Sequence, residues 1–174
     1  MSCVADAKEV LMKTMVILTA SLLLAFCGCA PKTDVQADKA AVRAIVDSLM
    51  IATETDNFDL FARIVSHSPD NVFYGTDSAE RFVGYESFID ATRRQCASVE
   101  PGSQFTLRDV VVSISTDGDA AWVSYLADWK GKVQGQPFTL IGARSTVVLE
   151  KQNSRWNIVH AHVSVPISGQ AVKY

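Results

Sequence analysis

The sequence predicts an α+β domain in which three amino-terminal helices pack on a strongly curved, mainly antiparallel sheet. Up to about residue 98, apolar side chains recur at steps of three and four residues, which is the period of an amphipathic helix. From about residue 104 they alternate instead, as in strands with one buried face. Strands this long twist, so we expect the sheet to curl around the helices into a cone-shaped barrel with a hollow.

The helical part contains three candidate helices and two short strands. The first helix is expected at about 37–55, and the Asp56-Asn57 pair can cap a second, shorter helix that carries Phe58 and Phe61. A third helix is expected at 85–98, with Phe88, Ile89, Thr92 and Cys96 facing inward. Segments 72–74 and 81–83 are short strand candidates.

The remaining chain predicts a meander of four strands, separated by turn-forming residues. We expect these strands at 104–116, 120–132, 136–151 and 155–165.

The parity of the last three strands sorts their side chains onto two faces. Odd-numbered positions, such as Ala121, Ile141 and Val147, are mostly small or apolar, and we expect them to pack on the helices. Even-numbered positions mix aromatic and polar groups and form the opposite face: Trp122, Ser124, Asp128, Arg144, Thr146, Trp156, His160, His162 and Ser164.

A three-residue loop at 152–154 fixes the expected register of the last hairpin, unless a bulge interrupts it. The expected cross-strand pairs are Lys151 with Arg155, Thr146 with His160, and Arg144 with His162.

The amino terminus predicts export. Lys13 precedes an apolar stretch at 15–26, which is too short to span a membrane and is typical of a secretory signal. The Gly28-Cys29 pair that follows resembles the end of a bacterial lipoprotein signal, which implies lipidation of Cys29. We therefore expect a signal peptide at 1–28, a tether at 29–36, a domain at 37–166 and a tail at 167–174. An ordinary cleaved signal without lipid is the alternative, and translation from Met12 would give a more typical basic start.

This organisation places the domain in the bacterial cell envelope, at its periplasmic or extracellular face. Membrane contact is expected only through the lipid anchor. The net charge is −3, and removing the signal leaves it unchanged because two basic and two acidic residues are lost. This mildly acidic chain has no basic cluster, so we expect no nucleic-acid partner.

Several classes of chemistry have no support in the sequence. The chain lacks a glycine-rich phosphate loop, a serine nucleophile elbow and a Cys-x-x-Cys pair. Beyond Cys29 the only cysteine is Cys96, an inward helical thiol with no adjacent base. We expect no cofactor.

Two stretches carry a resemblance to a known family: Gly84-Tyr85-Glu86-Ser87-Phe88, and the closing strands with Arg144-Ser145-Thr146 followed by residues 155–164. They resemble the SnoaL-like branch of the nuclear transport factor two-like superfamily, over roughly residues 37–165. The resemblance implies a cone-shaped α+β barrel with a pocket between helices and sheet, usually in a homodimer built on the sheet. Its relatives include ketosteroid isomerase, polyketide cyclases and scytalone dehydratase, so the fold alone does not define the chemistry.

Three residues are candidate proton carriers. His160 and His162 are candidates because histidine is the side chain best suited to acid-base catalysis near neutral pH; alternatively, they hydrogen-bond across the strand or a dimer. Asp128 resembles the placement of carboxylate bases in enzymatic relatives, where apolar walls raise the pKa; a solvent-facing aspartate is the alternative. A metal site is not expected, because the two histidines would need a third ligand from His67 or Asp128.

Four residues are candidate ligand contacts. Tyr74, Trp122 and Trp129 can line an apolar pocket, although aromatic residues are often core. Arg144 can bind a substrate carboxylate through its forked donors, or pair with Glu150 or Asp128.

Two functions remain open on this basis. One is an envelope-anchored domain that binds a small, partly apolar molecule or an envelope protein, without catalysis. The other is a proton-transfer enzyme of the isomerase, cyclase or dehydratase type.

Overall fold

The computed structural model describes residues 34–169. The expected signal peptide, Cys29, most of the tether and the end of the tail lie outside the described residues. The elements are α2 (Val35–Glu54), α3 (Phe58–Ile64), β1 (Val72–Tyr74), β2 (Arg81–Val83), α4 (Tyr85–Ser98), β3 (Gln104–Ile114), β4 (Ala120–Val133), β5 (Gln136–Gln152) and β6 (Arg155–Ser164).

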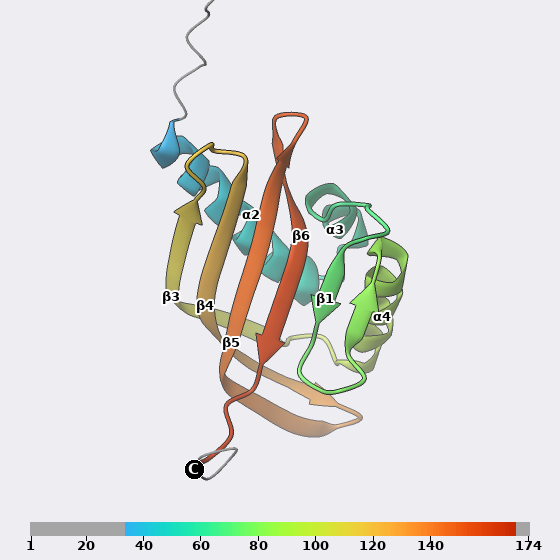
Figure 1. Cartoon of the computed structure of the whole chain (residues 1–174). Helices are drawn as coiled ribbons and strands as arrows, with labels where there is room; N and C mark the ends of the chain where they lie inside the picture. Colours follow the sequence, from blue (N-terminus) through green and yellow to red (C-terminus); the bar gives the residue numbers. More distant parts are fainter. Residues whose placement is uncertain (1–33, 170–174) are drawn as a thin grey trace, which may run out of the picture. The chain divides into compact units, whose positions relative to one another are not determined.

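The predicted fold class is confirmed. Six strands form one sheet in the order β2-β1-β6-β5-β4-β3, and α2 lies across one face of it (Figure 1). The joined ends of β4 and β5 bend away from the rest of the sheet toward α4 (Figure 1). This curvature leaves the cone open on one side, where a pocket forms.

The helix starts follow local hydrogen bonding. The Asp34 side chain accepts hydrogen bonds from the backbone N–H groups of Gln36 and Ala37, both at 3.1 Å, so α2 begins at Val35 rather than near residue 37. Asn57 caps α3 by accepting from the Leu60 N–H at 3.0 Å, as the sequence predicted.

The core lies between α2 and the sheet. Val42 and Val46 of α2 are fully buried, as are Val123, Val147 and Leu149 on the sheet. The stacked rings of Phe73 and Phe88, 4.1 Å apart, join β1 to α4. No helix within residues 34–169 is both long enough and apolar enough to cross a membrane.

The short strands β1 and β2 extend the sheet beyond the four strands of the expected meander. β1 pairs with β6 in parallel, with Val72 opposite His160 and Tyr74 opposite His162. This pairing covers the backbone of β6, which would otherwise be an edge strand. It also brings Tyr74 next to the two histidines.

The predicted register of the last hairpin is wrong. Its loop has two residues, Asn153 and Ser154, both with positive φ (51° and 62°), and Gln152 therefore pairs with Arg155. A register shift follows between Val148 and Leu149, where β6 contributes one extra residue. The actual pairs are Lys151 with Trp156, Thr146 with His162, and Arg144 with Ser164.

The irregular positions also change which side chains are buried. Trp156, predicted on the outer face with the histidines, is 6% exposed and lies in the core, because the shift in β6 reverses the alternation beyond it. Ile141, predicted to face the helices, is 52% exposed. Here the positive φ of Gly142 (68°) and the register shift between β4 and β5 reverse the alternation of β5.

Candidate functional site

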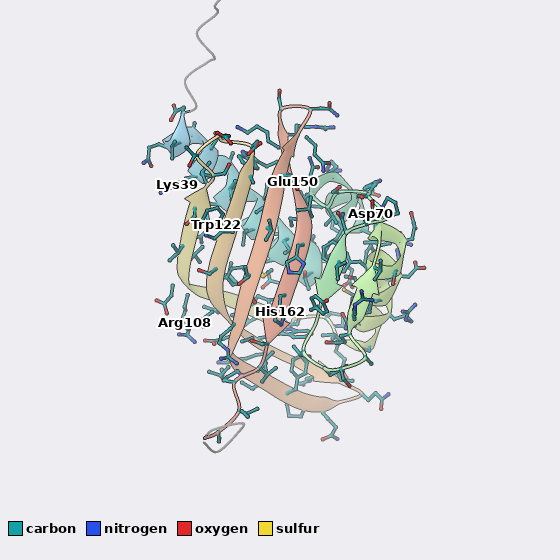
Figure 2. All side chains as sticks on the ribbon, viewed as in Figure 1. Lys39, Asp70, Arg108, Trp122, Glu150 and His162 are labelled. Carbon is teal, nitrogen blue, oxygen red and sulfur yellow. The ribbon has the colours of Figure 1, made fainter. Side chains whose placement is uncertain are left out.

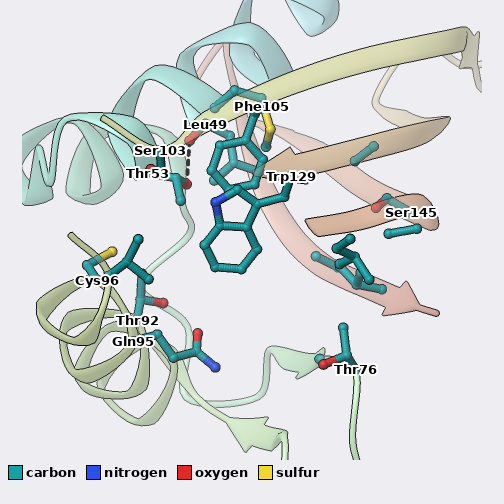
Figure 3. A pocket seen from close by; sticks show the side chains of 18 of the residues that line it. Leu49, Thr53, Thr76, Thr92, Gln95, Cys96, Ser103, Phe105, Trp129 and Ser145 are labelled. Atoms are coloured by element: carbon teal, nitrogen blue, oxygen red, sulfur yellow. Dashed lines mark hydrogen bonds between the residues drawn. The ribbon is translucent and has the colours of Figure 1, made fainter. Parts of the chain in front are cut away.

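A pocket of about 510 Å³ opens between the concave side of the sheet and the helices. Figure 3 shows Trp129 of β4 projecting into its middle, with Thr92 and Gln95 of α4 and Thr76 of the β1–β2 loop on the facing side. The pocket is lined mostly by apolar groups, a composition typical of small-molecule sites. Its lining includes Leu49, Thr53, Phe61, Phe73, Phe82, Phe88, Cys96, Phe105, Tyr125, Phe138, Leu140 and Ala161.

Three aromatic rings form one wall of the pocket. Phe105 pairs with Trp129 across β3 and β4, and their rings stack at 4.9 Å. The ring of Phe138 meets Trp129 edge-on at 4.7 Å. Gly131 faces Phe138 across the strands, and a Cβ there would lie 2.8 Å from the Phe138 ring. A glycine at 131 therefore gives Phe138 the room to reach Trp129.

The indole of Trp129 brings a polar group to this apolar wall. Its Nε1 is buried and makes no hydrogen bond within residues 34–169. A buried donor without an acceptor raises the free energy of the site by about 1–3 kcal/mol. An acceptor atom that reaches this nitrogen would recover that free energy.

The facing wall is polar and is held by Glu80. One carboxylate oxygen of Glu80 accepts hydrogen bonds from the backbone N–H and, at 3.0 Å, the hydroxyl of Thr76. The other accepts from Gln95 Nε2 at 2.6 Å. Glu80 thus connects the β1–β2 loop to α4 across the side of the pocket.

Cys96 also lines the pocket, from the inner face of α4, as predicted. Burial, and then the carboxylate of Asp56 as hydrogen-bond partner and neighbouring charge, together raise the pKa of its thiol to about 11. The thiol is therefore protonated at neutral pH, and this position does not favour a nucleophile.

Asp128, the candidate base, does not line the pocket. Its carboxylate forms a two-pronged ion pair with Arg108 at 2.8 and 3.0 Å and accepts from the Gly142 N–H at 2.8 Å. Bonding to the Arg108 guanidinium, then to the Gly142 N–H, holds the pKa of Asp128 below its usual range. A general base needs the opposite shift, so this environment does not favour that role.

The histidines lie beside Tyr74. The Tyr74 ring meets His160 at 6.0 Å and His162 at 5.7 Å, both edge-on. His160 Nδ1 lies 2.6 Å from the carbonyl oxygen of Val72, so this ring is fixed against β1. His162 and Tyr74 contribute to the pocket lining, and His160 does not.

Two predicted ligand contacts, Trp122 and Arg144, lie outside the pocket lining. Trp122 is 48% exposed on the sheet face that points away from α2 (Figure 2). Arg144 is exposed on the neighbouring strand, and the ion pair of Asp128 is with Arg108 instead. Of the three pocket aromatics predicted, Trp129 and Tyr74 line it.

His67, a candidate third ligand for a zinc site, makes its contacts elsewhere and not with His160 and His162. The ring of His67 stacks on Tyr85 at 4.0 Å, and its Nε2 lies 2.9 Å from the Ala62 carbonyl oxygen. Within residues 34–169, no three His, Cys, Asp or Glu side chains are grouped to hold a metal ion.

The sequence interpretation missed Phe105, Phe138, Glu80 and Gln95 as site residues. Pairing β3 with β4 would have placed Phe105 beside Trp129, since both positions lie near the ends of predicted strands. No sequence signal connects Glu80 to Gln95, because their contact depends on how the β1–β2 loop meets α4.

The family follows from this fold and a match over most of the chain. Residues 42–168 match the model of the SnoaL-like domain, and the chain belongs to this family. No curated protein sequence matches the chain significantly.

Solved structures share the fold. A nuclear transport factor 2-like superfamily protein from Salmonella enterica superposes with a TM-score of 0.70 at 17% identity, covering 80% of this chain and 99% of that one. A proposed dehydratase of the same family from Streptomyces avermitilis gives 0.66 at 17% identity, covering 76% and 99%. The association domain of the Caenorhabditis elegans calmodulin-dependent kinase II gives 0.61 at 21% identity, covering 75% and 97%. At these identities the likeness shows the fold alone.

Proposed function

We propose that this domain binds a small, partly apolar molecule in the pocket between the helices and the curved sheet. The observation that carries the proposal is the 510 Å³ pocket itself, with a three-ring aromatic wall on one side and the polar Thr76, Gln95 and Glu80 group on the other. Such a volume suits a molecule of one to three rings.

The binding proposal is tested with the neutral fluorophore N-phenylnaphthylamine. We expect the fluorescence of this probe to increase and then saturate as it binds to the protein. Trp129→Leu should weaken binding by about tenfold, which equals about 1.4 kcal/mol. Trp122→Leu is the matched control and should leave binding unchanged, because Trp122 lies outside the pocket. Equal weakening by both substitutions, or by neither, would contradict the proposed site.

Proton-transfer catalysis is the second candidate, and one observation favours it. Tyr74 and His162 both belong to the pocket lining, and their rings lie edge to face on the side of β1 and β6 that also carries His160, so an imidazole and a phenol lie together beside the pocket. A β,γ-unsaturated ketone tests this idea, because its conversion to the conjugated isomer changes its absorbance. The enzyme hypothesis predicts turnover of this ketone, and it predicts that His162→Gln abolishes turnover while ligand binding persists. Absence of turnover in the folded wild-type protein would contradict the hypothesis.

The outer face of the sheet supports self-association into a homodimer, with an envelope protein as the alternative occupant. Val111, Trp122 and Ile141 are 58%, 48% and 52% exposed there. Trp122 lies opposite Val148, which in turn lies opposite His160, so a partly apolar band crosses β4, β5 and β6. Contiguous exposed apolar groups of this kind commonly mark interfaces.

Envelope anchoring through Cys29 remains part of the proposal and rests on the sequence of the leader. Metabolic labelling with a radioactive fatty acid in a bacterial host tests it. Label should enter the wild-type protein and be absent from Cys29→Ala; label retained in that variant, or absent from both, would contradict lipidation at Cys29.

A further inference from the structure

The charges that line the pocket all have one sign. Glu54, Asp56, Glu80 and Glu100 belong to the lining, and none of the lining residues is a lysine or an arginine. His162 is the one histidine among the lining residues, and its ring lies edge-on to Tyr74 on the side of β6 that also carries His160.

These carboxylates are held by neutral donors. Glu54 accepts a hydrogen bond from the Phe105 N–H at 2.7 Å, and Glu100 accepts one from the Gly135 N–H at 2.5 Å. The ion pairs observed within residues 34–169 involve other carboxylates. Neutral donors stabilise the ionised form without cancelling its charge, so the lining stays negative.

Glu80 is the best placed of the four. It is partly buried, and its hydrogen-bond partners Thr76 and Gln95 both line the pocket. Thr76 and Gln95 lie on the side of the pocket that faces Trp129 (Figure 3), so the Glu80 carboxylate that they bind lies at that wall. Reduced solvent exposure strengthens the field of such a charge compared with one in bulk water.

The aromatic wall is a second, independent feature that favours a positively charged ligand. Phe105 and Trp129 stack on one another, so each offers its other face, and an aromatic face carries negative electrostatic potential that attracts cations within about 6 Å. Phe138 meets Trp129 edge-on and keeps that wall apolar. An apolar skeleton can pack on this wall while a positive group lies within reach of both the rings and Glu80.

We infer that the pocket selects an organic cation: an amine, protonated or quaternary, on an apolar skeleton that contains a ring. The inference rests on the proposed binding function and adds the charge of the ligand to it. A carboxylate on the same skeleton meets like charges and no cationic partner, so the same lining excludes acids.

Three probes with one skeleton separate charge from shape: naphthylmethylamine, naphthalenemethanol and naphthoate, which are cationic, neutral and anionic at neutral pH. Isothermal titration calorimetry on the folded protein gives each affinity. We expect the amine to bind about tenfold more tightly than the alcohol, and the acid to bind more weakly than the alcohol. The preference for the amine should shrink when the salt concentration rises, because part of the lining is exposed to solvent.

Isosteric substitutions identify the carboxylates responsible. Glu80→Gln and Glu54→Gln each keep an oxygen acceptor for the backbone N–H and remove the charge. Each should lower the affinity for the amine by about threefold to tenfold and leave that for the alcohol unchanged. Glu150→Gln is the control, because Glu150 is exposed on β5 and does not line the pocket.

The outcomes distinguish this inference from the function on which it rests. If none of the three probes binds, both the proposed function and the charge preference fail. If the alcohol or the acid binds as tightly as the amine, the pocket binds ligands but the charge inference is overturned. It is also overturned if the amine is preferred and both pocket variants behave like Glu150→Gln.

Discussion

Asp128 and Trp129 are adjacent in sequence and serve different sides of the sheet. Successive side chains of a strand point to opposite faces, so Trp129 enters the pocket while Asp128 pairs with Arg108 on the outer side. The sequence predicted that an aromatic and a carboxylate at this position would matter. It could not predict that Arg108, on another strand, would form an ion pair with the Asp128 carboxylate.

Asp38 joins α2 to the last hairpin. Its Oδ1 accepts hydrogen bonds from Lys151 Nζ at 2.7 Å and Trp156 Nε1 at 3.1 Å, and its side chain is only 15% exposed. The hydrogen bond from Lys151 holds the pKa of Asp38 below its usual range, against the effect of burial and with help from Trp156.

We predict that Asp38→Ala lowers the free energy of unfolding by about 1–3 kcal/mol at neutral pH, because it removes the acceptor of the buried Trp156 N–H and of the partly buried Lys151 ammonium. A carboxyl whose pKa is lowered by folding stabilises above its unfolded pKa, and this stabilisation is lost as the pH falls through the folded value. Urea unfolding over a pH series should therefore show the two proteins converging in acid. Asp47→Ala removes an exposed pair with Arg43 and should cost under about 0.5 kcal/mol. A constant difference at all pH values would contradict the assignment.

Cys96 gives a prediction about reactivity. A thiol pKa near 11 leaves roughly a hundredfold less thiolate at pH 8 than an unperturbed cysteine has. Iodoacetamide labelling, followed for the peptide containing Cys96 by mass spectrometry, should therefore be slowed at least about a hundredfold in the native protein relative to the protein in denaturant. Equal rates in the two states would show that the thiol is accessible and ionised.

At the scale of elements, regular segments were predictable and their irregularities were not. The bounds of β1, β2 and α4 were predicted to the residue because turn residues delimit them. The register of β5 and β6 was wrong, because a two-residue turn and a one-residue bulge leave no distinct pattern in sequence. The bulge in β6 misplaced Trp156, and the separate register shift between β4 and β5 misplaced Ile141.

The turn of the last hairpin offers a test at this scale. Ser154 has a φ of 62°. This left-handed conformation has a higher free energy for a residue with a Cβ than for glycine. We predict that Ser154→Gly raises the free energy of unfolding by about 0.5–1 kcal/mol in thermal or urea unfolding. Ser124→Gly, at an exposed position inside β4, should lower it by a similar amount. The same sign for both substitutions would contradict the turn geometry.

At the scale of the whole domain, the helix-then-strand order predicted the architecture, and strand twist predicted the hollow. The lining of the hollow was only partly predictable. Trp129 and Tyr74 were identified, whereas Trp122 lies on the outer face, where its even-numbered position in the strand alternation had placed it, and so it does not line the pocket.

The outer face predicts a dimer that depends on apolar contact. Trp122→Ser together with Val111→Ser should shift the protein from dimer to monomer in light scattering coupled to size exclusion, because both exposed side chains lie on that face. Ligand binding in the pocket should persist in the double variant. A wild-type protein that is monomeric at tens of micromolar concentration would contradict the homodimer.

The three tryptophans provide the most direct measurement of the central claim. Trp129 lies in the pocket, Trp122 on the outer face, and Trp156 in the core beside Asp38. Their indole N–H signals can be assigned by single substitution and followed by two-dimensional NMR during titration with naphthylmethylamine and naphthalenemethanol. We predict that the Trp129 signal moves in a saturable manner while those of Trp122 and Trp156 stay in place. Movement of the Trp122 signal alone, or of none of the three, would contradict a ligand site between the helices and the curved sheet.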